Sequence, residues 1–144
     1  MRDASYSGVT RAAGPGGEGG TMSSTKALIV DDEEDMRVLL RMTIEAANQG
    51  LSVAAEAANG WEAIDLWREH RPDVIVLDQR MPDLSGMDVA ARILAEAPRQ
   101  RIILFSAFLN DELVHEAETL GLACLGKEKV REIPELLWRL APDA

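Results

Sequence analysis

The chain has 144 residues, of which 47% are hydrophobic, so it is long enough for one globular domain with a sizeable core. Its 25 acidic residues outnumber its 15 basic residues, and the net charge of −10 argues against direct binding to nucleic acid, which needs a basic face. No apolar run approaches the roughly 20 residues of a membrane span, and the single Cys124 cannot form an internal disulfide, which fits a cytoplasmic location.

The first 25 residues differ in composition from the rest of the chain. Six of the 11 glycines fall there, and five of those lie between Gly14 and Gly20. No apolar segment typical of a secretory signal is present, so the composition predicts a disordered tail over residues 1–25. If translation instead starts at Met22, the tail is not native. Residues 26–141 are left for the folded domain.

Five short apolar runs alternate with five segments in which apolar residues recur at helical spacing. The runs predict strands over residues 26–30, 51–57, 74–77, 101–105 and 122–125. The spacing predicts helices from the acids at 31–35 to Asn48, from Asn59 to about His70, from Gly86 to Pro98, from about Asp111 to Gly121, and from about Pro134 onwards. The second run alternates between apolar and polar residues, which predicts an edge strand with one wetter face.

Strand–helix units in unbroken alternation predict an α/β fold, with a parallel sheet and helices on both of its faces. Right-handed crossovers leave few topologies, and we expect the doubly wound, five-stranded, flavodoxin-like order 2-1-3-4-5. Ligands bind such sheets beyond the carboxyl ends of the strands, at the switch point between strands 1 and 3. Asp31 and Asp32 follow strand 1 and Asp78 follows strand 3, so we expect their carboxylates to flank that crevice.

We expect the side chains that carry the chemistry of the chain to lie in this crevice. Because the carboxylates of Asp31, Asp32 and Asp78 repel one another, a cation must join them, and hard oxygen ligands favour Mg²⁺. Ser106 after strand 4 supplies a hydroxyl, and Lys127 just past strand 5 supplies a positive charge. This set is typical of phosphoryl transfer, in which a carboxylate is an accepted nucleophile. The alternative is that these residues only cap helices and carry solvated charge.

The residues at these strand ends form short motifs in a fixed order. They are Leu28-Ile29-Val30-Asp31-Asp32, Asp78-Gln79-Arg80-Met81-Pro82, Gly86, Phe105-Ser106-Ala107 and Lys127. One such motif is weak evidence, but all of them together are highly specific, and residues 26–141 resemble a response-regulator receiver domain. The stretches Glu56–Gly60 and Arg71–Val74 are similar to receivers of the nitrate-response type.

The resemblance implies a metal site and a phosphorylation site. Asp78 would accept the phosphoryl group and also ligate Mg²⁺. Asp32 would ligate Mg²⁺ directly, Asp31 through water, and the backbone carbonyl of Arg80 would complete the protein's share of the shell. The resemblance also implies that Lys127 would hold one oxygen of the phosphoryl group and that Ser106 would hold another.

The resemblance also implies partners. The phosphoryl donor would be a phosphohistidine on a sensor histidine kinase or on a histidine phosphotransfer protein. The chain would not be an enzyme in its own right, but a switch that assists its own Mg²⁺-dependent phosphorylation and dephosphorylation. No residues follow Ala144 to form an output domain, so we expect a single-domain regulator that signals through an unidentified target protein or through onward phosphate transfer.

Two departures from the family pattern bear on switching. Cys124 stands where the family carries Tyr or Phe, so the usual swing of an aromatic ring is in doubt, and Phe108 is the nearest large side chain that would replace it. Glu128 stands where a proline often follows the lysine, and a non-proline cis bond is costly, so we expect the 127–128 peptide to be trans. Helical spacing turns Trp138 away from the last apolar stripe, which makes it a candidate contact for a partner or for a homodimer through the fourth and fifth helices.

Two other functions remain open from the sequence. A pseudo-receiver would have the same fold but would bind its partner without phosphate. Cys124 favours that hypothesis weakly, and the intact set of acids, hydroxyl and lysine disfavours it. The chain would alternatively be the receiver fragment of a transcription factor, which is disfavoured because residues 140–144 lack the start of a linker.

Overall fold

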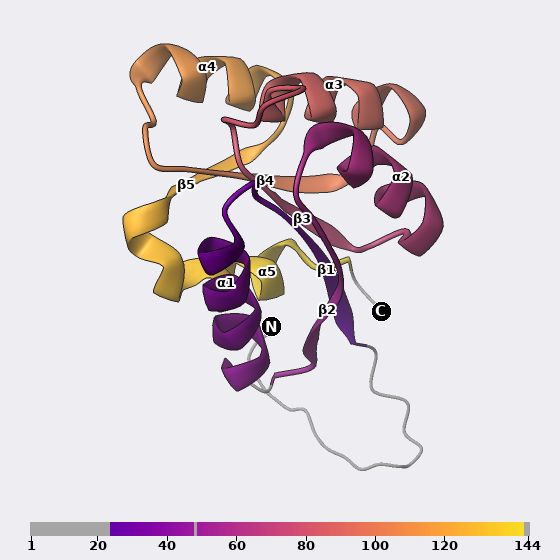
Figure 1. Cartoon of the computed structure of the whole chain (residues 1–144), viewed down its shortest axis with the longest axis vertical. Helices are drawn as coiled ribbons and strands as arrows, with labels where there is room; N and C mark the ends of the chain where they lie inside the picture. The colour runs from indigo at the N-terminus through magenta and orange to yellow at the C-terminus, as the bar shows by residue number, and fades with distance from the viewer. Residues whose placement is uncertain (1–23, 48, 143–144) are drawn as a thin grey trace.

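A computed structural model describes residues 24–47 and 49–142, in which strands and helices alternate along the chain (Figure 1). The strands are β1 (Thr25–Val30), β2 (Leu51–Ala57), β3 (Val74–Leu77), β4 (Arg101–Ser106) and β5 (Ala123–Gly126). The helices are α1 (Glu34–Ala47), α2 (Gly60–His70), α3 (Gly86–Glu96), α4 (Asp111–Thr119) and α5 (Ile133–Leu140). A short 3-10 helix, η1 (Lys127–Glu132), leads into α5 and was not predicted. Residues 1–23 of the predicted tail lie outside the described residues, and Thr25 already belongs to β1.

The described strands form one parallel sheet in the order β2-β1-β3-β4-β5, which confirms the predicted topology. β2 lies at one edge of the sheet, as its alternating pattern indicated. In the register between β1 and β3, Val30 pairs with Leu77, so the residues that follow, Asp31 and Asp78, leave the sheet side by side. The amide of Asp78 donates to the carbonyl oxygen of Val30 at 2.9 Å, which fixes this alignment. The switch point therefore lies between the two acid-bearing strand ends.

The sheet separates two apolar cores, because successive side chains of a strand point to opposite faces. In β3, Ile75 and Leu77 face the core under α2, α3 and α4, whereas Val74 and Val76 face the core under α1 and α5. Figure 1 shows the same division, with α2, α3 and α4 on one side of the sheet and α1 and α5 on the other. All four β3 side chains are buried, which explains why this strand reads as an unbroken apolar run. The sheet is therefore packed against helices on both of its faces.

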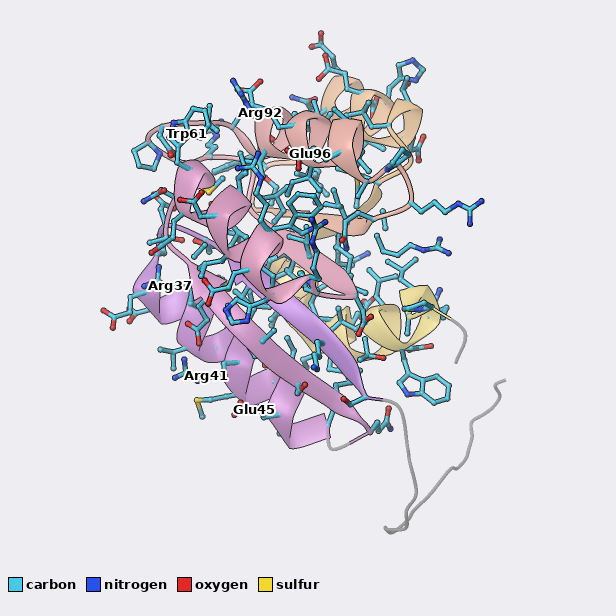
Figure 2. The ribbon with its side chains drawn as sticks, turned by 90° about the vertical axis from the view of Figure 1, so that its right-hand side faces the viewer. Arg37, Arg41, Glu45, Trp61, Arg92 and Glu96 are labelled. Atoms are coloured by element: carbon cyan, nitrogen blue, oxygen red, sulfur yellow. The ribbon has the colours of Figure 1, made fainter. Side chains whose placement is uncertain are left out.

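Two predictions about tryptophans were wrong. The helical spacing of Trp61, Ile64 and Trp67 predicts that all three lie in the core, but Trp61 is 51% exposed and carries the guanidinium of Arg92 over its ring at 4.8 Å. It lies in the first turn of α2 (Figure 2), where the neighbouring Gly60 is buried instead. Trp138 was expected to point outward, but it is half-buried against the second core, and its indole N–H donates to the carbonyl oxygen of Gln49 at 3.1 Å.

Smaller differences follow from helices that are less fully covered than their patterns suggested. Helical spacing puts Leu39 on the apolar stripe of α1 and Leu120 on that of the fourth predicted helix, which predicts that both face inward, but both are exposed. The last strand begins one residue later than predicted, at Ala123. Within residues 24–47 and 49–142, no helix combines the length and the hydrophobicity needed to cross a bilayer.

Candidate functional site

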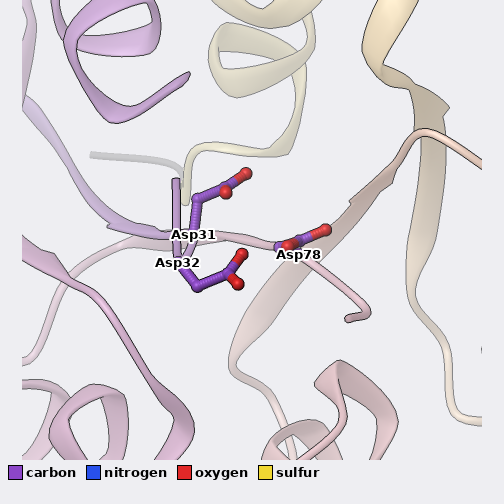
Figure 3. A group of neighbouring side chains, drawn as sticks. All are labelled: Asp31, Asp32 and Asp78. Atoms are coloured by element: carbon purple, nitrogen blue, oxygen red, sulfur yellow. The ribbon is translucent and has the colours of Figure 1, made fainter. Parts of the chain in front are cut away.

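The three predicted acids meet at the carboxyl ends of β1 and β3. Asp31 and Asp78 are buried and Asp32 is exposed, and one carboxylate oxygen from each lies within 4.8 Å of the other two. Figure 3 shows the side chains of Asp31 and Asp32 extending from the end of β1 toward the same space as Asp78. Such a cluster of hard oxygen ligands, partly open to water, suits Mg²⁺.

The contacts of the two carboxylate oxygens of Asp31 indicate whether the acid cluster fits a cation. Its Oδ1 accepts the amide of Glu33 at 2.9 Å, which ties the side chain to the turn before α1. Its Oδ2 is fully buried and accepts no hydrogen bond of good geometry within the described residues, although the ammonium of Lys127 lies 2.8 Å away. A buried carboxylate oxygen with unused acceptor capacity is costly unless a further positive group meets it. The donor set therefore fits a divalent cation.

Lys127 supplies the fixed positive charge of the site. It follows β5, whose last residue, Gly126, pairs with Ser106, and its side chain is only 12% exposed. Its Nζ lies 2.8 Å from Asp31 Oδ2 and 3.3 Å from Asp78 Oδ1. Burial alone would lower the pKa of Lys127, but its close contacts with the two negatively charged aspartates outweigh burial and raise that pKa. The lysine therefore stays protonated at neutral pH.

Asp78 is held in an environment that disfavours its charge. Burial, followed by the negative charge of Asp31, raises the pKa of Asp78 to about 6, although Lys127 opposes the shift. One ammonium is thus too little positive charge for two buried carboxylates. A divalent cation would restore the balance, which is what a site for a dianionic phosphoryl group needs.

Gly86 lies at a position where the backbone of Asp78 leaves room only for a residue without a side chain. Its amide donates to the carbonyl oxygen of Gln79 at 2.9 Å, so the start of α3 lies directly against the loop after β3. A Cβ atom at this position would clash with the backbone carbonyl oxygen of Asp78. Close backbone approach, rather than an unusual backbone conformation, is therefore the reason for this glycine.

Ser106 is the last residue of β4, and Arg80 lies in the loop after β3. Ser106 is buried at the end of β4, and its Oγ accepts the amide of Phe108 at 3.2 Å. Arg80 follows Asp78 by two residues, and its guanidinium lies 4.9 Å from the centre of the Phe108 ring. This contact joins the β3–α3 loop to the β4–α4 loop. That the carbonyl of Arg80 would ligate a metal stays a prediction.

Cys124 leaves open space where the family pattern places a ring. It is half-buried, it packs against the core under α4, and burial raises the pKa of its thiol, which fits a small apolar residue rather than a reactive one. A groove of about 470 Å³ opens beside it and is lined also by Ser106. The 127–128 peptide is trans as predicted, since the described residues contain no cis peptide bond.

One residue of the site was missed by the sequence analysis. Arg37 of α1 donates from Nη1 to the backbone carbonyl oxygen of Asp31 at 2.7 Å. The only signal for it was a basic side chain two residues after a run of acids, and helix charge patterning alone explains such a residue. Its side chain also lies beside Glu56 of β2, a tertiary contact that no local pattern contains.

Comparisons with known proteins agree with this geometry. Residues 27–132 match the model of the response regulator receiver domain. The chemotaxis protein CheY of Thermotoga maritima is 38% identical over 96 residues, which cover 67% of this chain and 78% of CheY. Sporulation initiation phosphotransferase F of Bacillus subtilis is 32% identical over 100 residues, covering 69% and 78% of the two chains. The solved response regulator domain of Thermotoga maritima CheB matches with a TM-score of 0.72 at 30% identity, over 81% of this chain and 93% of that one. The finer likeness to nitrate-response receivers stays a prediction.

Proposed function

This chain belongs to the family of response regulator receiver domains, and from that premise we propose that it is a switch that accepts a phosphoryl group on Asp78. The observation that carries the proposal is the pairing of a buried aspartate with a buried lysine, Asp78 Oδ1 to Lys127 Nζ at 3.3 Å, beside two further carboxylates. Purely structural ion pairs do not need the second and third acid. The excess negative charge is useful only if a cation and a phosphoryl group are bound there.

The residues proposed to hold Mg²⁺ are Asp31, Asp32, Asp78 and the backbone carbonyl of Arg80. The buried Oδ2 of Asp31, which faces the ammonium of Lys127 but accepts no hydrogen bond of good geometry within the described residues, and the exposed carboxylate of Asp32 support this assignment. Bound there, the ion would supply charge neutralisation for the incoming phosphoryl oxygens.

The protein's own groups would carry the transfer. Asp78 attacks as a carboxylate, so a P–O bond forms to one of its oxygens while the P–N bond to the donor imidazole breaks and the electron pair returns to that nitrogen. Lys127 is placed to hold one phosphoryl oxygen and Ser106 to donate its hydroxyl to another. Because the pKa of Asp78 is about 6 even without a cation, most of the protein carries the nucleophilic carboxylate at neutral pH.

The proposed donor is a phosphohistidine on a sensor histidine kinase or on a histidine phosphotransfer protein. We propose that the output is a protein contact made by the β4–α4 loop, α4 and α5, either with a target protein or in a homodimer. Phe108 supports this location, because it is 66% exposed and follows Ser106 by two residues. Trp138 is not the outward anchor expected from the sequence, since its indole is engaged with Gln49.

The test uses acetyl phosphate as the phosphoryl donor, with Mg²⁺, and measures the intact mass of the protein. Wild-type protein is expected to gain one phosphoryl group, and the Asp78→Asn variant none. Asp35→Asn, which removes an exposed acid from the first turn of α1, is the matched control and should gain the group normally. If Asp78→Asn is modified as readily as wild type, the assignment is wrong. If none of the proteins is modified, a pseudo-receiver that acts without phosphate is the better account.

A further inference from the structure

Arg37 holds the backbone of the acid-bearing turn through the carbonyl oxygen of Asp31. Its side chain is only 18% exposed, although arginine is usually a surface residue. Besides the bond from Nη1 to the carbonyl oxygen of Asp31, its Nε lies 3.7 Å from Oε1 of Glu56 on β2. Arg41, one turn further along α1 (Figure 2), forms an ion pair with the other oxygen of Glu56. The glutamate is thus held between two arginines, and it orients the one that reaches the site.

The carbonyl that Arg37 holds belongs to the peptide bond between Asp31 and Asp32. A peptide group is planar, so fixing its oxygen fixes the plane from which the next residue departs. Asp31 is also held through its own amide, which donates to the carbonyl oxygen of Ala57 at 3.1 Å, and through its Oδ1. Asp32 is exposed, so the direction of its carboxylate depends on this backbone anchor.

We propose that Arg37 is a positioning residue for the divalent cation. It would not touch the ion, and would act by keeping the Asp31–Asp32 peptide in the orientation that aims the Asp32 carboxylate at the ion. The inference rests on the proposed function, because it requires that the acids bind a cation. Outer contacts that orient metal ligands commonly contribute strongly to metal affinity.

The alternative is that Arg37 is a mere counter-charge for nearby acids or a strut between α1 and β2. The positioning role and the counter-charge role predict changes of opposite sign in cation affinity when Arg37 is replaced. Removing a positive charge near a cation site should tighten cation binding by reducing repulsion. Removing a positioning contact should weaken binding, even though the same charge is lost. The direction of the change therefore decides between them.

The experiment measures Mn²⁺ affinity by electron paramagnetic resonance and Mg²⁺ affinity by calorimetry, for wild type, Arg37→Gln and Arg41→Gln. Arg41→Gln is the matched control, because it removes the same charge and a bond to the same Glu56 without touching Asp31. We expect Arg37→Gln to bind Mn²⁺ about tenfold more weakly than wild type. Arg41→Gln should remain within about twofold of wild type, since Glu56 and Arg37 still face each other.

A conservative variant and a metal-free measurement protect the test against loss of the fold. Arg37→Lys keeps the charge, but one ammonium lacks the planar fork that serves Asp31 and Glu56 together, so its affinity should fall between those of wild type and Arg37→Gln. In metal-free protein, the Glu33 amide, which is bonded to Asp31 Oδ1, should exchange with solvent faster in Arg37→Gln than in Arg41→Gln.

Each outcome decides something definite. Weaker binding by Arg37→Gln, with Arg41→Gln unchanged, supports the inference. Unchanged or tighter binding by Arg37→Gln overturns it, and so does equal weakening of both variants. If wild type itself binds neither Mn²⁺ nor Mg²⁺, the proposed metal site fails first, and the role of Arg37 falls with it.

Discussion

Replacing Asp78 with asparagine is expected to stabilise the metal-free protein at neutral pH. Burial and the charge of Asp31 raise the pKa of the Asp78 carboxyl from 3.8 to about 6 in the fold. Between these two values the folded state keeps a proton that the unfolded chain has already lost. The free energy of unfolding therefore falls as the pH rises through this window, and the penalty is complete above pH 6. Asparagine has nearly the same shape and carries no charge, so the variant escapes the penalty.

The size of this effect follows from the shift. A displacement of about two pKa units corresponds to at most about 3 kcal/mol. Water reaches the open crevice from the side of the exposed Asp32 and screens the carboxylates, which reduces the expected stabilisation to about 1–2 kcal/mol. Below pH 3.8 both the folded and the unfolded Asp78 are protonated, and the two proteins should differ little.

Urea unfolding in chelator, at a series of pH values from 4 to 8, measures the difference directly. Groups that titrate alike in both proteins cancel from it. We expect wild type and Asp78→Asn to be nearly equally stable at the acid end, with the variant gaining about 1–2 kcal/mol by pH 7.5. Excess Mg²⁺ should stabilise wild type more than the variant and close the gap. A variant that is less stable at pH 7.5, or a difference that does not change with pH, would refute the reasoning.

Three further predictions follow from the same geometry. Asp32→Ala should lower Mg²⁺ affinity at least about tenfold and more than Asp31→Ala does, as measured by calorimetry; equal affinities would remove the distinction between direct and water-mediated ligands. Gly86→Ala should lower the free energy of unfolding by about 1–3 kcal/mol, because its Cβ meets the backbone of Asp78, and urea unfolding checks this. Phe108→Ala should shorten the lifetime of the aspartyl phosphate, because the exposed ring shields the phosphoryl group from water; an unchanged lifetime would mean that Phe108 plays no such part.

The sequence predicts the acid cluster well because each of its parts is local. The β1 and β3 strands are buried on both faces, so their apolar runs are unbroken and end where Asp31 and Asp78 begin. The topology rules for parallel sheets then place those ends together without any knowledge of side-chain packing. Ser106 and Lys127 follow in the same way from β4 and β5.

The parts that could not be predicted depend on contacts between distant segments. Arg37 matters because Glu56 on β2 turns it toward the Asp31 carbonyl, and helical spacing contains no trace of that partner. Helical spacing identifies an apolar stripe, but it does not say where other elements stop covering it. Trp61 is therefore exposed in the first turn of α2, whereas Trp138 is half-buried and its indole N–H donates to the carbonyl oxygen of Gln49.

The most direct test of the central claim is to locate the phosphoryl group. Wild-type protein is treated with acetyl phosphate in Mg²⁺ or in chelator and then reduced with borohydride, which converts an aspartyl phosphate into homoserine. Tandem mass spectrometry reads its position. Homoserine at position 78, formed with Mg²⁺ and absent with chelator, is the predicted result. Homoserine at Asp31 or Asp32, or at no position while the protein still binds Mg²⁺, would contradict the account.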